Sequence, residues 1–573
     1  MCSVRRDWIR GGSPLPGKAA YRFRMLPGRM MDFPLTITHL LTHAEQFFGT
    51  REVVSTLPDR SKQRSNYAEI GERARRLANA LVKLDVKPGD RVATLCWNHR
   101  QHLEAYFGIP GTGAVIHTLN LRLHPKEIGY IANHAEDTVV IVDHSLLPLF
   151  EQFRPTLKSL RHVIVVNPEN KPLDGAHSEY LDYETILAAA PSAYDWPALD
   201  EKAAAMLCYT SGTTGNPKGV LYTHRSIVLH ALVCAQGNHM GITGDDVVLP
   251  VVPMFHASAW GLPFIAILAG AKLVFPGPYL DPPSLLGLME SEKVTAAGGV
   301  PTIWLGILAI LDENPKKYDL SSVRTMLIGG SAAPPGMIEG FHTRHGLSVL
   351  HAWGMTETNP VGTLARVKPH LHGDIKHELP IRASQGFALP FVETRHVDGT
   401  GKVLPWDGTS AGELECRGAW VAASYFGDEG KDRFTADGWF KTGDVVTIDA
   451  EGYLSITDRE KDVIKSGGEW IASVAMEDLL MSHPAVLEAA VFAAKHEKWT
   501  ERPVAAVVFK PNHTATEAEL AAHLGGNFTK YQCPDAYVFM DQIPRTSTGK
   551  FLKTKLRETY GDILTARAST SKK

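Results

Sequence analysis

Cysteine is scarce in this chain of 573 residues, which holds six cysteines and no Cys-x-x-Cys pair. Thiols scattered in this way fit reduced, structural thiols in a cytoplasmic protein better than a disulfide framework or a zinc site. An excess of one charge is also missing, because 59 Lys and Arg residues stand against 62 Asp and Glu residues. A nearly neutral chain gives no reason to expect nucleic acid or an anionic membrane as its main partner.

A continuous transmembrane helix is missing as well, although one stretch resembles it. Residues 247–271 contain no Asp, Glu, Lys or Arg and are long enough to span a bilayer. However, Pro250, Pro253 and Pro263 would each remove a helix hydrogen bond, and His256 lies near the middle. We therefore expect a buried strand, a loop and a short helix here, and no transmembrane segment.

The first 30 residues differ from the rest, with seven Lys or Arg residues and one acid, Asp7. Such a composition is typical of transit peptides, but Pro14, Pro16 and Gly17 interrupt a continuous amphipathic helix. We expect residues 1–30 to be a disordered extension outside the folded unit. A start of translation at Met30 or Met31 is the alternative.

The remaining chain is too long for one ordinary domain. From residue 31 onward, strand-like apolar runs alternate with helical stretches, which predicts an α/β fold of doubly wound, mainly parallel sheets. Short strands with glycine turns after about Ile381 predict a small β-barrel, and a mixed pattern after Arg459 predicts a small mobile α/β domain. We expect an N-terminal domain over 31–458, a hinge at 459–461 and a C-terminal lid domain over 462–573.

The segment YTSGTTGNPKGV, residues 209–220, has the composition of a phosphate-binding loop. Its backbone amides and hydroxyls can surround a phosphate, and Lys218 adds positive charge. It is not the common phosphate loop, because Pro217 stands where that motif needs Gly, and Gly219 where it needs Ser or Thr. Taken alone, it is better explained as a glycine-rich turn between a strand and a helix, so its interpretation depends on other motifs.

Three further motifs supply suitable partners for a nucleotide. In HAWGMTET, Trp353 can stack on a base, Thr356 can donate to a phosphate and Glu357 can hold Mg²⁺. In GWFKTGD, Asp444 can accept hydrogen bonds from both ribose hydroxyls. In IPRTSTGK, Lys550 can neutralise negative charge that develops during a reaction. Each motif alone has a plainer explanation, such as a surface ion pair.

Together the motifs resemble those of a known family. YTSGTTGNPKGV, WGMTE, WFKTGD, DREKDVIKSGGEWI and PRTSTGK are similar, in this order, to the motifs of the adenylate-forming superfamily. That superfamily includes acyl-CoA synthetases, peptide-synthetase adenylation domains and luciferases, and the resemblance spans roughly Pro34 to Leu556. Trp353 and Trp470 resemble the medium-chain branch that includes 3-methylmercaptopropionyl-CoA ligases.

The resemblance implies an AMP-forming acid–thiol ligase that uses ATP, Mg²⁺ and coenzyme A. A carboxylate, from a short- or medium-chain fatty acid or from 3-methylthiopropionate, would be adenylated and then transferred to CoA. The implied catalytic residues are Lys218, Thr356, Glu357 and Lys550, with Thr210 and Glu357 at the metal. The other implied ATP-binding residues are Ser211, Gly212, Thr213, Thr214, Gly215, Gly329, Gly330, Ser331, His351, Ala352, Trp353, Gly354, Met355, Asp444 and Arg459.

The resemblance also assigns the second half-reaction and the acyl pocket. Lys461 matches the family's hinge, and the CoA-binding residues would be Ser466, Gly467, Gly468 and Trp470. The acyl pocket would be lined by His256, Trp260 and Gly261, with Trp260 and Trp304 limiting the tail. Peptide-synthetase domains place an Asp after the Phe of this motif, whereas His256 follows Phe255 here. A neutral acyl tail is therefore expected, because a buried unpaired ammonium is costly.

Two other functions remain as alternatives. The acyl group can be passed to an external carrier protein instead of CoA, or the chain can be a catalytically silent acyl or nucleotide sensor. The sensor requires loss of a key group, and Glu357, Asp444, Arg459 and Lys550 are all present. The sequence leaves open whether the chain forms a homodimer.

Overall fold

A computed structural model describes residues 28–570 apart from 170, 174, 211–215, 460, 461, 463, 467, 468, 472, 497, 498, 526, 529 and 547–549. Residues 1–34 are a unit separate from residues 35–573. The described part of the first unit, residues 28–34, contains no helix or strand. The expected extension lies almost entirely outside the described residues, and all that follows concerns residues 35–573.

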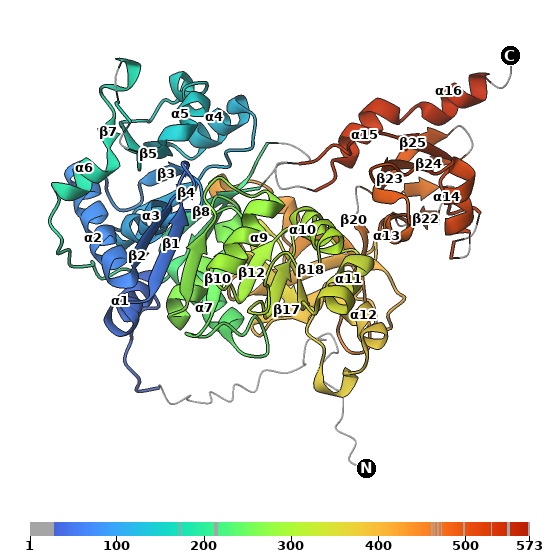
Figure 1. Ribbon diagram of the computed structural model, residues 1–573, viewed down its shortest axis with the longest axis horizontal. Helices are drawn as coiled ribbons and strands as arrows, with labels where there is room; N and C mark the ends of the chain where they lie inside the picture. The colour runs from blue at the N-terminus through green and yellow to red at the C-terminus, as the bar shows by residue number, and fades with distance from the viewer. Residues whose placement is uncertain are drawn as a thin grey trace, which may run out of the picture. The chain divides into compact units, whose positions relative to one another are not determined.

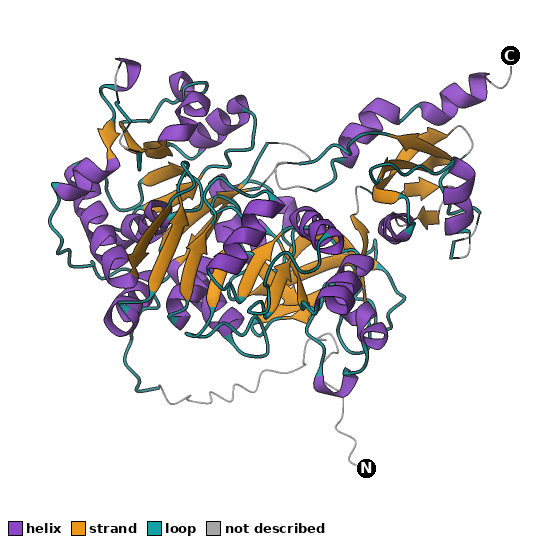
Figure 2. Ribbon diagram, in the orientation of Figure 1, coloured by secondary structure: helices purple, strands orange, loops and turns teal. Residues whose placement is uncertain are grey.

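Two large sheets dominate the first two thirds of this unit (Figures 1 and 2). The seven-stranded sheet has the order β7-β6-β5-β3-β4-β8-β9, and its neighbours are parallel except for the β8–β9 pair. Its strands are β3 Arg91–Leu95, β4 Val115–Thr118, β5 Asp137–Asp143, β6 His162–Val166, β7 Leu181–Asp182, β8 Ala204–Tyr209 and β9 Gly219–Thr223.

The nine-stranded sheet has the order β16-β15-β14-β13-β12-β10-β11-β1-β2. Its central strands, from β14 to β1, are parallel, and antiparallel strands complete both edges. Its strands are β1 Glu52–Thr56, β2 Lys62–Asn66, β10 Val247–Pro250, β11 Lys272–Phe275, β12 Ala296–Gly299, β13 Thr325–Ile328, β14 Val349–Gly354, β15 Val361–Leu364 and β16 Phe387–Ala388. These two sheets confirm the predicted doubly wound α/β class.

Helices cover the faces of both sheets, as the βα alternation predicts. The main ones are α1 Ile37–Phe48, α2 Tyr67–Lys83, α3 Arg100–Gly111, α4 Pro125–His134, α5 Leu147–Phe150, α6 Tyr183–Ala188, α7 His224–Ala235, α8 Leu262–Ala269, α9 Pro282–Ser291, α10 Pro301–Glu313, α11 Pro335–His345 and α12 Ile375–Ala383. Helix α3 is buried on all sides, and its Glu104 is held there by Arg73 at 2.6 Å and by the hydroxyl of Tyr183 at 2.8 Å. A buried carboxylate needs partners of this kind.

The charge-free run forms the three predicted elements. Strand β10 covers Val247–Pro250, a loop with a short 3-10 turn follows, and helix α8 covers Leu262–Ala269. Within the described part of the chain, no helix has the length and apolar character needed to cross a membrane. The prolines explain the result, since Pro250 ends the strand and Pro263 stands in the first turn of α8, where no helix hydrogen bond is lost.

A four-stranded antiparallel sheet takes the place expected for the small barrel. Its order is β17-β18-β19-β20, with strands at Val392–Val397, Gly412–Gly418, Phe440–Ile448 and Leu454–Arg459. A five-stranded sheet follows, with order β22-β21-β24-β23 and with β25 paired to β24. Its elements are β21 Ile464–Ser466, β22 Glu469–Ile471, α13 Val474–Ser482, β23 Val486–His496, β24 Thr500–Phe509, α14 Glu517–Leu524, β25 Ala536–Phe539, α15 Lys553–Tyr560 and α16 Ile563–Thr570.

The cysteines of the described residues are free thiols, as their spacing predicts. Four of them are buried and Cys533 is partly exposed. Burial raises the pKa of the Cys96, Cys234 and Cys416 thiols, so these groups stay protonated at neutral pH.

Candidate active site

A cavity of about 480 Å³ lies beyond the carboxyl ends of the parallel strands. Thr210 follows β8, Gly329 and Gly330 follow β13, and Met355 follows β14, and all four residues line the cavity. Ligands of open α/β sheets bind at this edge, because the loops that leave the strands converge there. The topology therefore brings together motifs that are more than 100 residues apart in the sequence.

The phosphate-loop motif connects two antiparallel strands, β8 and β9, and helix α7 comes only after β9. The loop is closed at its base by two hydrogen bonds. The amide of Thr210 donates to the carbonyl of Lys218 at 2.9 Å, and the amide of Lys218 donates to the Thr210 hydroxyl at 3.3 Å. Both residues line the cavity. The tip of the loop, with Ser211, Gly212, Thr213, Thr214 and Gly215, lies outside the described residues.

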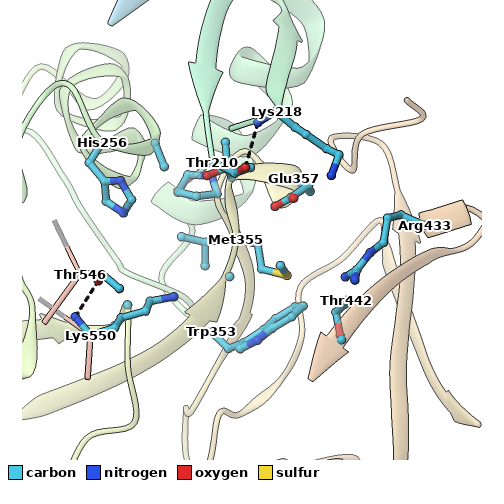
Figure 3. A pocket seen from close by; sticks show the side chains of 18 of the residues that line it. Thr210, Lys218, His256, Trp353, Met355, Glu357, Arg433, Thr442, Thr546 and Lys550 are labelled. Carbon is cyan, nitrogen blue, oxygen red and sulfur yellow. Dashed lines mark hydrogen bonds between the residues drawn. The ribbon is translucent and has the colours of Figure 1, made fainter. Parts of the chain in front are cut away.

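The loop that carries Lys550 is closed in the same way. The amide of Thr546 donates to the carbonyl of Lys550 at 2.8 Å, and the amide of Lys550 donates to the Thr546 hydroxyl at 3.2 Å. Lys218 directly precedes β9, Lys550 lies in the loop between β25 and α15, and the two lysines approach the cavity from opposite sides (Figure 3). Positive charge is thus available at two places around one space.

Glu357 supplies a carboxylate to the same cavity. It lies in a short 3-10 turn after β14, at residues 356–358, and is 5% exposed. The hydroxyl of Tyr425 donates to its Oε1 at 2.5 Å. Thr356 lines the cavity beside it, and its carbonyl accepts a hydrogen bond from Tyr222 at 2.6 Å. Burial and the nearby Glu357 raise the pKa of Tyr425, so its phenol remains a hydrogen-bond donor.

Trp353 and Asp444 are in direct contact. The indole N–H of Trp353 donates to Oδ2 of Asp444 at 2.9 Å, and both side chains are buried. Asp444 pairs with Arg459 across strands β19 and β20; the Arg459 side chain is not described. The three residues expected around the base and ribose therefore lie next to one another.

A second cavity, of about 190 Å³, adjoins this group. It shares Gly330, Trp353, Gly354 and Lys550 with the first cavity. Its lining includes the other residues expected near the nucleotide, namely Ser331, His351, Ala352 and Asp444. The structure describes most of the residues predicted for the ATP site, and all of these except Arg459 line one of the two cavities. Arg459 pairs with Asp444, which lines the smaller cavity.

His256 and Trp260, two of the three residues predicted for the acyl pocket, line the larger cavity. Burial, with Lys550 and Arg122 nearby, lowers the pKa of His256 to about 4, so its imidazole is neutral at pH 7. The Trp260 indole packs on Gly329, where an added Cβ would lie 3.3 Å from the ring. Gly261, the third residue predicted for the acyl pocket, is not among the residues that line the cavity. It packs against His230, whose ring would lie only 2.6 Å from a Cβ added at this position.

Trp304 occupies a different place from the one expected. Its side chain is fully buried in the core formed by α9, α10 and α11, and its indole donates to the carbonyl of Gly299 at 2.9 Å. Trp304 is therefore a core residue, and of the two tryptophans Trp260 is the one that lines the cavity. Sequence spacing alone could not distinguish the two faces of the sheet.

The predicted CoA-binding residues belong to the segment of the β21–β22 hairpin. Gly467 and Gly468 of this segment lie outside the described residues, and so does the predicted hinge residue, Lys461. Ser466 is fully buried, and its hydroxyl accepts a hydrogen bond from Arg502 at 3.4 Å. Its side chain therefore anchors the hairpin to strand β24. Of Trp470 only the backbone, in β22, is described.

Several residues that line the cavity were not predicted from the sequence. Tyr425, Asp432 and Arg433 lie in the connection between β18 and β19, Thr442 and Gly443 lie in β19, and the C-terminal part supplies Asp462, Phe551, Leu552, Lys553 and Thr554. Thr442 and Gly443 belong to the motif WFKTGD and Asp462 to DREKDVIKSGGEWI, so their place in a motif is a signal that sequence reasoning could use. Tyr425 and Arg433 had none.

Comparisons with known proteins agree with this geometry. Residues 41–426 match the profile of the family described as AMP-binding enzyme, and residues 475–550 match the profile of the AMP-binding enzyme C-terminal domain. The chain therefore belongs to the AMP-binding enzyme family, which confirms the resemblance to adenylate-forming enzymes and the prediction of an enzyme.

Similar proteins bear the names of acid–CoA ligases. The chain is 45% identical to the medium-chain-fatty-acid–CoA ligase of Ectopseudomonas oleovorans, over 95% of this chain and 99% of that protein. It is 44% identical to the 3-methylmercaptopropionyl-CoA ligase of Ruegeria pomeroyi, over 94% and 99%. Among solved structures, ATP-bound MatB from Rhodopseudomonas palustris is 28% identical with a TM-score of 0.78, covering 92% of this chain and 99% of that one.

Proposed function

We propose that this protein is an ATP-dependent, AMP-forming ligase that joins a short- to medium-chain carboxylic acid to coenzyme A through an acyl-adenylate. One observation carries the proposal. Lys218, Glu357 and Lys550, from three separate loops, line one cavity at the carboxyl edge of the parallel sheets. The names of the similar proteins support the same reaction.

In the first step, a carboxylate oxygen of the acid attacks the α-phosphorus of ATP. The bond from that phosphorus to the oxygen bridging to the β-phosphorus breaks, and pyrophosphate leaves. The Thr210–Lys218 loop binds the β- and γ-phosphates, and Lys550 bridges the acid's carboxylate and the α-phosphate as negative charge accumulates. Fixed positive charge around a partly closed space stabilises such a transition state without reorganisation of solvent.

The residues near Glu357 also fit a divalent cation. A buried carboxylate that lines the cavity, with a threonine hydroxyl of the same lining, is the hard-oxygen donor set that Mg²⁺ accepts beside phosphate oxygens. Glu357 and Thr210 would hold the ion, which when bound neutralises charge on the phosphates. The residues themselves orient the phosphate chain and keep it in register with the attacking carboxylate.

Asp444, Arg459 and Trp353 orient the nucleoside. The Asp444 carboxylate accepts hydrogen bonds from the ribose hydroxyls, and the Trp353 N–H fixes one of its oxygens at 2.9 Å. Gly329 and Gly330 allow the backbone to approach the adenine because they have no Cβ. Thr356 donates to a phosphate, and the lining residues Ser331, His351, Ala352, Gly354 and Met355 complete the nucleotide site.

In the second step, the sulfur of CoA attacks the acyl carbon, its proton is released to solvent, and the carbon–oxygen bond to AMP breaks. We assign the chain to an N-terminal domain over 31–458, a hinge over 459–461 and a C-terminal domain over 462–573. Rotation at Lys461 withdraws Lys550 and brings the hairpin with Ser466 to Trp470 to the pantetheine arm. One domain motion then separates the two half-reactions.

The acid is expected to have an uncharged tail. His256 is neutral at pH 7 because its pKa is lowered to about 4, so it neither pairs with an ammonium group nor attracts a second carboxylate strongly. Trp260, packed against Gly329, forms the wall that limits the tail. Fatty acids of short to medium length and 3-methylthiopropionate satisfy both conditions.

The proposal also covers the compartment and the assembly of the protein. Free, mostly buried thiols suit a reducing compartment, and we place the protein in the cytoplasm on that ground. The homodimer stays a prediction, which the mass of the protein in solution tests directly.

A substrate panel tests the proposed function. Purified protein is given ATP, Mg²⁺ and acids from C3 to C16, including 3-methylthiopropionate, and pyrophosphate, AMP and thioester are measured. CoA and a phosphopantetheinylated carrier protein are compared as acceptors. We expect release of pyrophosphate and formation of the CoA thioester with acids of short to medium length. If only the carrier protein accepts the acyl group, the protein is an enzyme that loads carrier proteins. If no acid leads to release of pyrophosphate, the result favours a catalytically silent sensor.

A further inference from the structure

Tyr425 lies between the two charged groups at the phosphate end of the cavity. It follows strand β18 and is 5% exposed, and its hydroxyl donates to Oε1 of Glu357 at 2.5 Å. The ammonium of Lys218 lies over the ring of Tyr425, with Nζ 5.8 Å from the ring centroid. One side chain therefore contacts both the carboxylate and the ammonium.

Lys218 and Glu357 carry opposite charges and line the same cavity. Opposite charges attract strongly where water is partly excluded. In a direct ion pair, neither the carboxylate nor the ammonium would be available to bind a ligand. In the described part of the chain, however, no ion pair joins them, and each contacts Tyr425 instead. The phenol hydroxyl is a neutral donor for the carboxylate, and the ring face attracts the ammonium without neutralising it.

Resting on the proposed function, we infer that Tyr425 is a positioning residue that keeps Glu357 and Lys218 apart, so that Glu357 stays available to a divalent cation and Lys218 to the ATP phosphates. The hydroxyl holds one carboxylate oxygen, Oε1, and leaves Oε2 for a ligand. The ring attracts the ammonium of Lys218, whose Nζ lies 5.8 Å from the ring centroid, in place of the carboxylate.

The surroundings of Tyr425 fix its ring in this place. Phe434 and Phe440 meet it edge-on, with centroid distances of 5.7 and 6.5 Å. Gly430 has a φ of +58°, and an added Cβ would lie 2.9 Å from the Tyr425 ring and 3.2 Å from Cε of Lys218. A glycine is therefore required for the backbone to approach both side chains. A ring packed on these sides cannot swing away when a ligand enters.

Two substitutions separate the roles of the hydroxyl and the ring. Tyr425→Phe removes the hydrogen bond to Glu357 and keeps the ring beside Lys218. Tyr425→Leu removes both and lets the lysine reach the carboxylate. Tyr453→Phe is the matched control, because it also removes a tyrosine hydroxyl bond, to the carbonyl of Arg366 at 2.7 Å, elsewhere in the N-terminal part.

Three quantities are measured for each variant. These are the free Mg²⁺ concentration that gives half-maximal pyrophosphate release, the KM for the acid, and the calorimetric affinity of a non-hydrolysable ATP analogue with Mg²⁺ and with EDTA. We expect Tyr425→Phe to raise the half-saturating Mg²⁺ concentration about tenfold, because one hydrogen bond to a charged group is lost. The KM for the acid should stay within about twofold of the wild type. Its affinity for the analogue in EDTA should remain that of the wild type.

Tyr425→Leu should in addition lower the affinity for the ATP analogue in EDTA about tenfold, because Lys218 then pairs with Glu357. Tyr453→Phe should change none of the three quantities by more than about twofold. A wild-type Mg²⁺ dependence in Tyr425→Phe, or an equal rise of the KM for the acid, would overturn the inference. If the wild type releases no pyrophosphate, the proposed function fails, and the calorimetric arm still decides the role of Tyr425.

Discussion

At the scale of single residues, hydrogen bonds within the site fix the positions of its charged residues before a ligand binds. A threonine closes each of the two lysine loops, since Thr210 binds both backbone groups of Lys218 and Thr546 binds both of Lys550. A loop closed at its base loses less conformational freedom when its lysine meets a phosphate. The same principle applies to Trp353, which holds Asp444 in place.

Thr546→Val tests this at the second loop. The substitution keeps the shape of the side chain but removes the hydroxyl that accepts the Lys550 amide at 3.2 Å. We expect adenylate formation to fall about tenfold, as for the loss of one buried hydrogen bond, with little change in thioester formation from added acyl-adenylate. Thr559→Val is the control, because its hydroxyl bonds only within exposed helix α15, at 2.9 Å. A wild-type rate of adenylate formation in Thr546→Val would contradict the role given to this bond.

Much of the site could be predicted at this scale, because its charged residues stand in motifs of fixed spacing. Lys218, Glu357, Asp444 and Lys550 were all named from such motifs, and the structure places them around two adjoining cavities. Tyr425 could not be predicted, since its partner Glu357 is 68 residues away and nothing in ASYFGDEG marks a contact. Contacts across sheets depend on tertiary packing that a single sequence does not display.

At the scale of elements, strand positions follow the apolar runs closely, whereas the connection after a strand is harder to predict. The run 137–143 forms β5 and the run after Arg324 forms β13, because buried parallel strands need continuous apolar residues. The prolines in residues 247–271 and His256 predict a strand, a loop and a short helix, and the structure confirms all three. The phosphate loop proved to be a hairpin connection between β8 and β9, which the alternation of strands and helices does not predict.

The β21–β22 hairpin is held by a small polar network. Arg502 is 4% exposed, binds Asp535 through two bonds of 2.7 Å and reaches the Ser466 hydroxyl, while the Tyr531 hydroxyl donates to the Ser466 carbonyl. Among the described residues, β21 pairs with β24 at Ser466 and Thr500, and this network adds side-chain contacts that hold the hairpin there. The hairpin carries the proposed CoA-binding segment.

Tyr531→Phe should therefore affect the second half-reaction. Loss of the hydroxyl loosens the hairpin, and we expect thioester formation to fall about fivefold to tenfold while adenylate formation stays within about twofold. Rapid-quench measurements of the two steps, with Tyr560→Phe in α15 as a matched control, decide the matter. An equal fall in both steps would show that the network stabilises the whole domain rather than the hairpin.

A substitution in the proposed hinge addresses the domain motion. Lys461→Pro fixes φ near −65° and removes a backbone N–H, which restricts rotation there. We expect thioester formation to fall at least about tenfold, with adenylate formation within about threefold, because the first half-reaction needs no rotation. Lys461→Ala, which keeps backbone freedom, is the control. Equal losses in both half-reactions would refute the hinge assignment.

At the scale of the whole molecule, buried histidines make stability depend on pH. Burial lowers the pKa of His102 and His230 to about 3 and of His224 to about 4, below the ordinary value of 6.5. The unfolded chain therefore binds more protons than the folded one between about pH 4 and 6.5. Folding stability rises with pH through this window and is lost as the pH falls through it.

These three histidines each take up a proton on unfolding and together contribute about 4 kcal/mol per pH unit to the slope near pH 5. We expect the unfolding free energy, from denaturant titrations, to be nearly level above pH 7 and to fall steeply below pH 6. His224→Gln, which removes one of these protons, should lower the slope near pH 5 by about 1.4 kcal/mol per pH unit. An unfolding free energy that is level from pH 7 to 5 would contradict the buried, neutral state of these side chains.

Two lysine loops meet at one cavity, and each half-reaction is proposed to use its own set of residues. Lys550 should act in adenylate formation and not in thioester formation. Both half-reactions of Lys550→Ala are therefore measured separately, with an acid that the wild type accepts. We expect adenylate formation to fall about 10²–10³-fold, while thioester formation from added acyl-adenylate stays within about threefold of the wild type. Equal losses in both steps, or wild-type adenylate formation, would contradict this role of Lys550.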